Sequence, residues 1–97
     1  MHEQEQLWHD VRKQLIPLGA VFDRGESASK YRDWFRETLD QNELELALHA
    51  VCEFLIENPN ATLKTAELDR IRVAHELMSL EDDCIRKLVE RDAITPN

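Results

Sequence analysis

Apolar residues recur along this chain at spacings of three and four, which place them on one side of an α-helix. In the first such run, over residues 3–16, they are Leu7, Val11 and Leu15. Trp8 and Leu18 accompany this stripe. We expect Pro17 and Gly19 to end or kink the helix, because proline lacks an amide hydrogen and clashes with the preceding turn. Residues 23–27 predict a loop.

Two further helices are predicted in the middle of the chain. One covers residues 28–39, with Ser27 as its N-cap. It carries an aromatic stripe that we interpret as core-facing, made of Tyr31, Trp34, Phe35, Thr38 and Leu39. The next follows Asn42 as N-cap, with Glu45 at the third helical position. Its apolar stripe is Leu44, Ala47, Leu48, Val51 and Leu55. An Asn-Pro-Asn run at residues 58–60 ends it.

The last third of the chain predicts two more helices. One spans residues 65–78 and has a face of Leu68, Ile71, His75 and Met78, on which we interpret the histidine as a satisfied, partly buried ring. Ser79 is the expected cap of the other, with Glu81 and Asp82 near its positive end. We expect residues 95–97 to be a frayed tail. Because the connections are short, the sequence predicts one all-α domain over residues 1–97, a compact bundle of four to five antiparallel helices.

Composition agrees with a folded protein, since 42% of the 97 residues are hydrophobic and 33% are charged. No stretch approaches the roughly 18 apolar residues that span a bilayer. The N-terminal residues lack the basic-then-apolar order of a secretory signal. Cys52 and Cys84 stand far apart, without CxxC spacing, which favours reduced thiols acting as small buried hydrophobes in a cytoplasmic protein. A disulfide or a metal role is the alternative.

The sequence offers no convincing catalytic or cofactor site. Phosphate-binding glycine loops, HExxH and GxSxG are absent. Glu45, His49 and Glu53 are spaced to serve a metal, but no second cluster supplies further ligands. Cys52 and His49 can approach as nucleophile and base, yet no third group orients them. We therefore expect no catalytic, cofactor-binding or metal-binding residues, and no enzyme.

Charge is distributed unevenly. The net charge is −8, and residues 37–63 hold six carboxylates with no Lys or Arg, which is −6 of that total. This segment supplies the predicted partner-binding residues, Asp40, Glu43, Glu45, His49, Glu53 and Glu57. An outward carboxylate row edged by aliphatic residues suits a basic protein partner, and it disfavours nucleic acid and anionic membranes. The alternative is a solvated face that serves solubility alone.

The run YRDWFRETLDQNELELALHAVCEFLIENPNATLKTAELDRIRVAHELMSL resembles small bacterial immunity proteins of polymorphic toxin systems, of the MafI-like type. The shared features are an aromatic-bearing helix with Trp34 and Phe35, an E-x-x-x-A-L helix start at residues 43–48, and an amphipathic helix at residues 68–78. The resemblance implies a cytoplasmic antitoxin that binds the C-terminal domain of a cognate toxin. Such toxins are frequently nucleases with basic surfaces.

Other functions remain open at this point. The main alternative is a non-enzymatic helical adaptor or regulatory subunit, which as a homodimer would have Leu46 or Ile56 at the contact. A helix-turn-helix is less favoured, because the basic stretch around Arg70 and Arg72 is interrupted by carboxylates.

Overall fold

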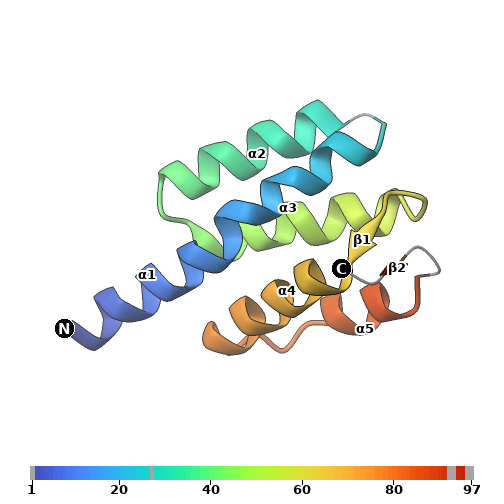
Figure 1. Cartoon of the computed structure of the whole chain (residues 1–97). Coiled ribbons are helices and arrows are strands. Elements are labelled where there is room, and N and C mark those ends of the chain that lie inside the picture. The colour runs from blue at the N-terminus through green and yellow to red at the C-terminus, as the bar shows by residue number, and fades with distance from the viewer. Residues whose placement is uncertain (1, 27, 92–93, 96–97) are drawn as a thin grey trace.

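The computed structural model describes residues 2–26, 28–91 and 94–95, and Figure 1 shows its arrangement. The helices are α1 (His2–Leu15), the 3₁₀ segment η1 (Ile16–Arg24), α2 (Ala28–Asp40), α3 (Leu44–Glu57), α4 (Thr65–Leu77) and α5 (Cys84–Val89). Consecutive α-helices run in alternating directions (Figure 1). A two-residue parallel pairing joins β1 (Leu63–Lys64) to β2 (Ile94–Thr95). The predicted all-α, compact fold is confirmed.

The most deeply buried element is α3, which lies between α2 on one side and α4 and α5 on the other (Figure 1). Its predicted apolar stripe is fully buried. The buried surface extends further around the helix than that stripe, because Ala50, Cys52 and Phe54 are buried as well. A helix that is apolar around most of its circumference belongs in a core.

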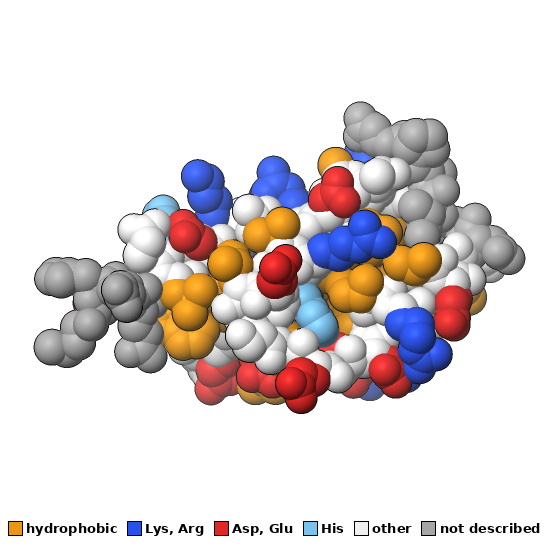
Figure 2. Space-filling model, turned by 90° about the horizontal axis from the view of Figure 1, so that it is seen from below, with side chains coloured by type: hydrophobic (Ala, Val, Ile, Leu, Met, Phe, Trp, Pro, Cys, Tyr) orange, Lys and Arg blue, Asp and Glu red, His pale blue; other side chains and the backbone are white. Residues whose placement is uncertain are grey.

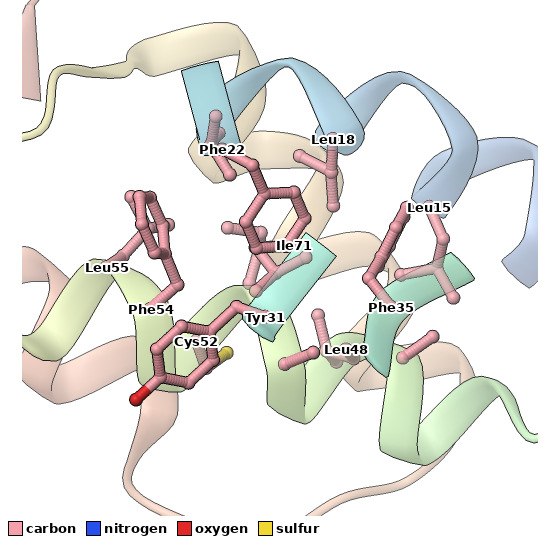
Figure 3. Packing of buried hydrophobic residues seen from close by; sticks show 14 of the residues in the cluster. Leu15, Leu18, Phe22, Tyr31, Phe35, Leu48, Cys52, Phe54, Leu55 and Ile71 are labelled. Carbon is pink, nitrogen blue, oxygen red and sulfur yellow. The ribbon is translucent and has the colours of Figure 1, made fainter. Parts of the chain in front are cut away.

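Aromatic rings fill the space where η1, α2 and α3 meet (Figure 3). The ring centroid of Phe22 lies 5.1 Å from that of Phe54 and 5.4 Å from that of Phe35. Tyr31 packs edge-on against Phe54 at 5.8 Å. The chain enters this region through Gly25, where an added Cβ would lie 2.6 Å from the Phe54 ring. Glycine is therefore required there for space.

The other predicted stripes mostly face the core. In α1, Val11 and Leu15 are buried and Leu7 is half-buried. The α2 stripe is buried except for Trp34, which is half-buried against the core. His75 of α4 is a partly buried ring with a hydrogen-bond partner, as predicted, since its side chain is 14% exposed and bonded to a carboxylate.

The end of the first helix differs from the prediction. Pro17 does end the α-helix, which stops at Leu15, but the chain continues as η1 through Arg24. This segment buries Leu18, Val21 and Phe22. Burial of these apolar side chains favours a helical backbone, which continues into the first two residues of the loop predicted at 23–27. Asp23 and Arg24 are therefore helical. The predicted cap Ser27 lies outside the described residues.

Two other predicted helix starts are wrong. Glu43, not Asn42, occupies the N-cap position of α3, because Asn42 adopts the left-handed backbone (φ 57°) of the preceding turn. Ser79 also has a left-handed backbone (φ 55°) and follows the end of α4 instead of starting the next helix. The fifth helix begins only at Cys84, whose backbone N–H donates to the Asp82 carboxylate at 3.0 Å.

The predicted frayed tail is partly corrected by the pairing of Thr95 with Lys64. Residues 96 and 97 lie outside the described residues. Just before this strand, Arg91 donates from Nη2 to the carbonyls of Asn58, Pro59 and Ala61. Burial lowers the pKa of this guanidinium. The end of the chain is thus tied to the loop that follows α3.

The two cysteines were predicted to be reduced, and this is wrong: Cys52 of α3 and Cys84 of α5 form a disulfide. Both are buried, as expected of small hydrophobes. They are 32 residues apart in sequence, and only the packing of α5 against α3 brings them together. None of the helices in the described part of the chain is long and apolar enough to cross a membrane.

Candidate partner-binding surface

The exposed side of α3 forms one continuous strip, which we call the acidic strip. At 100° per residue, the positions that are not buried fall within about one third of the circumference. They are Glu45, Leu46, His49, Glu53, Ile56 and Glu57. Two of them are aliphatic and well exposed, Leu46 at 41% and Ile56 at 37%. The strip therefore combines carboxylates with apolar surface.

Two further predicted residues continue the line beyond the start of α3. Asp40 ends α2, and Glu43 directly precedes α3; both are exposed. All six predicted partner-binding residues thus lie at or near the surface. The path that they define runs from Asp40 and Glu43, which precede α3, to the four on α3, a helix about 20 Å long. The two ends of this path differ in their surroundings.

From His49 onward, neighbouring elements lie against parts of the strip. His49 Nε2 lies 3.5 Å from Asp82 Oδ2, and the Glu57 carboxylate accepts a hydrogen bond from the Tyr31 hydroxyl. Glu53 shares a shallow hollow with Lys87 of α5. Residues 37–63 contain no cation, but the fold brings cations from other segments against them, including Lys87 here and Arg91 at the carbonyls of residues 58–61.

Asp82 is the centre of the contacts around His49. Its Oδ1 atom lies 2.9 Å from His75 Nε2 and accepts the Cys84 N–H. Burial alone raises the pKa of Asp82. The hydrogen bonds from His75 and Cys84, with the positive charges of His75 and His49, outweigh it, so the pKa is lowered from its ordinary value of 3.8. The carboxylate holds the α4–α5 connection against α3 and α4.

The N-terminal end of the path is different. Asp40, Glu43 and Glu45 form no ion pair with any residue that the structure describes. Beside them is a pocket of about 440 Å³, which we call the α1–α3–α4 pocket. It is lined by Leu7, Trp8, Asn42, Glu43, Leu44, Glu45, Leu46, Leu77, Met78 and Ser79. Figure 2 shows hydrophobic side chains gathered at the end of the molecule that carries the N-terminus, with carboxylates along one edge.

The apolar lining of this pocket was not predicted as functional. Leu7, Trp8 and Met78 matched core stripes by their helical spacing, yet all three are half-buried. The spacing correctly placed them on the inward side of α1 and α4. It carried no signal that the two helices leave a hollow beside the start of α3.

The chemical groups of the strip are carboxylates, one imidazole and two aliphatic side chains. No group of three or more His, Cys, Asp or Glu residues in the described ranges could hold a metal ion. The sulfur of Cys52 is joined to Cys84, so it is not a free thiol beside His49. What the strip and the pocket can do chemically is to offer negative charge and apolar surface to another molecule.

Comparison with known proteins gives no relative to draw on: no protein-family model, no curated protein and no solved structure matches the chain. The chemistry of the acidic strip and of the adjoining pocket is therefore what indicates a function.

Proposed function

We propose that this chain is an immunity protein that binds a basic bacterial toxin domain through the acidic strip and neutralises it. The observation that carries the proposal is the start of α3, where exposed carboxylates without ion-pair partners among the described residues adjoin an apolar pocket. The resemblance of residues 31–80 to MafI-like immunity proteins supports the same function.

Charge complementarity explains how such a protein can act. Nucleases hold the phosphate backbone with Lys and Arg side chains. A row of carboxylates on a rigid helix attracts the same cations, raises the association rate and makes binding sensitive to salt. Apolar contacts by Leu46 and Ile56 add affinity that salt does not screen. Occupying the cationic surface, or one adjacent to it, blocks the substrate.

The proposed location is the cytoplasm, so binding must tolerate a reducing environment in which the disulfide can open. Disulfides are rare in reducing compartments. Cys52 and Cys84 are only 4% and 8% exposed as residues, which limits attack by an external thiol on the folded protein. Glu45 lies seven residues, or about 10 Å along the helix, from the disulfide. We therefore expect the start of α3 to keep its shape, and binding to persist, in the presence of a reductant.

The test is co-expression with the C-terminal domain encoded directly upstream of this gene, scored by cell survival and co-purification. The strip variant, which reverses the charge at the start of α3, is Glu43→Lys/Glu45→Lys. Its matched control is Asp33→Lys/Glu37→Lys, which makes the same charge change on exposed positions of α2. We expect the wild type and the control to rescue growth and the strip variant to fail. Raising NaCl from 50 to 500 mM should weaken the wild-type complex at least tenfold.

Absence of both complex and rescue would reject the immunity function. Equal failure of the two variants would show that net charge, and not the start of α3, determines binding. Circular dichroism on each variant separates loss of binding from loss of fold, since none of the four substituted side chains is buried.

Exposed Leu46 and Ile56 also favour a second candidate, an adaptor or regulatory subunit that associates with itself. Light scattering distinguishes it. A homodimer would have twice the 11.4 kDa chain mass, and Leu46→Gln/Ile56→Gln would return it to the monomer. A monomer that binds the upstream domain supports the immunity function instead.

A further inference from the structure

The α1–α3–α4 pocket brings together apolar side chains from three helices at one end of the molecule. Leu44 forms its floor and is only 2% exposed. Around this floor, Leu7, Trp8 and Met78 are half-buried, each leaving part of a large apolar side chain in water. Covering that surface with another apolar group is favourable, at about 25 cal/mol for each Å² removed from water.

The volume of the pocket bears on what it can hold. At about 440 Å³ it lies within the range of roughly 300 to 1,000 Å³ typical of ligand pockets. That is enough for one large aliphatic or aromatic side chain together with part of its backbone. The walls come from helices that are fixed by the core, so the pocket exists before any ligand arrives.

The rim determines the sign of the charge that the ligand must carry. Glu43 and Glu45 stand at the edge of the pocket, and Asp40 lies at the other end of the same short turn. The described residues that line the pocket include no Lys or Arg. A ligand with carboxylates beside its apolar group would be repelled, and one with cations would be attracted.

We propose that this pocket anchors a large apolar side chain, of the size of Leu, Met or Phe, flanked by Lys or Arg in a segment of the protein partner. The identity of that partner rests on the proposed function. The segment places its apolar side chain over Leu44 and its cations on Glu43 and Glu45. The pocket thus supplies the apolar anchor, and the acidic strip supplies the orientation and the attraction at longer range.

The test uses defined peptides and the intact, disulfide-bonded protein. The probe is a fluorescein-labelled nine-residue amidated peptide with Phe at its centre, two Lys on each side and Gly or Ser elsewhere. Two matched peptides replace the Phe by Ala, or every Lys by Glu. Binding is followed by fluorescence anisotropy at 50 mM NaCl. A second readout with unlabelled peptide is the change in tryptophan emission of a Trp34→Phe variant, in which the remaining Trp8 lines the pocket.

Two protein variants make the test specific to the pocket. Leu46→Gln changes a lining residue that is 41% exposed, and Val73→Gln changes a residue of α4 that is 40% exposed and does not line the pocket. Neither substitution alters the charge or the core. We expect the Phe peptide to bind at least tenfold more tightly than the Ala peptide, and the Glu peptide not to bind. Leu46→Gln should weaken the Phe peptide about tenfold, whereas Val73→Gln should leave its affinity unchanged.

Equal affinity for the Phe and Ala peptides, equal effects of the two variants, or no binding of the Phe peptide would overturn the pocket assignment. These results are distinguishable from failure of the proposed function. If the upstream domain is neutralised but the peptides are not discriminated, the immunity function stands without the pocket. If the peptides are discriminated but the upstream domain is not bound, the pocket stands and its partner is a different basic protein.

Discussion

The two ends of α3 are similar in sequence but differ in what surrounds them. Glu43 and Glu45 at the start of the helix have no ion-pair partner in the described part of the chain and adjoin a pocket. Further along the helix, His49 contacts Asp82, and Glu57 at the last position accepts a hydrogen bond from Tyr31. The Glu57 carboxylate contacts another part of the fold, whereas Glu43 and Glu45 are exposed and have no such contact among the described residues. The acidity of a segment therefore does not by itself locate an interface.

The exposed and buried sides of α3 provide the largest expected contrast. Leu48→Ala removes a buried side chain and should lower the free energy of unfolding by about 2–5 kcal/mol, through lost apolar burial and the cavity left behind. Leu46→Ala, two residues away but 41% exposed, should change it by less than about 0.5 kcal/mol. Urea denaturation of both variants measures the difference. Similar losses would contradict the assignment of Leu46 to the binding surface.

Removing the disulfide, which joins α3 to α5, should lower the free energy of unfolding. Cys52→Ala/Cys84→Ala opens a crosslink between residues 32 apart, and we expect a loss of about 2–4 kcal/mol, since the bond restricts the unfolded chain. Urea denaturation with and without dithiothreitol measures it. Once urea unfolds the chain and exposes the bond, the reductant should destabilise the wild type by a similar amount, and it should have no effect on the double variant. An unchanged wild type under reduction would show that the buried sulfurs resist the reagent or that the bond contributes little.

The hydrogen bond from Tyr31 to Glu57 tests how firmly the end of the strip is held. Tyr31→Phe keeps the ring against Phe54 and removes only the hydroxyl, so we expect a loss of about 1 kcal/mol. In Tyr31→Phe, a further Glu57→Gln change should have little additional effect, because the two groups share one interaction. A double-mutant cycle by urea denaturation gives the coupling. Additive losses would mean that the two side chains act independently.

Asp82 gives the smallest expected effect, and it depends on pH. The pKa of this carboxyl is lowered in the folded protein, so its contribution to stability is present above about pH 4 and is lost as the pH falls through the folded value. Asp82→Asn should therefore lose less stability than the wild type between pH 5 and pH 3. Its side chain is 38% exposed and screened by water, so we expect a difference below about 1 kcal/mol.

Thermal unfolding at several pH values measures this dependence. Asp33→Asn is the control, because this residue is exposed and makes no ion pair with a described residue. It should follow the wild type. Identical pH profiles for all three proteins would show that the contacts of Asp82 with the two histidines do not depend on its charge.

Helical spacing in the sequence was sufficient to predict the main elements. The spacing of Leu44, Leu48, Val51 and their neighbours placed the core side of α3 correctly, because a helix of fixed pitch turns residue order directly into direction. The helix starts were less predictable. Asn42 and Ser79 are good caps by residue type, yet both adopt left-handed turn backbone, which asparagine tolerates better than most residues. Residue type alone does not distinguish a cap from a turn.

What the sequence by itself determined is therefore the all-α class, the inward faces of the helices and the uneven charge of residues 37–63. These are local properties, since each depends on residues within a few helical turns of one another. Only the tertiary structure decided that Cys52 meets Cys84, that Lys87 stands beside Glu53, and that α1 and α4 leave a pocket next to Glu43. Each of these brings together residues far apart in the chain, and their approach depends on how whole helices pack.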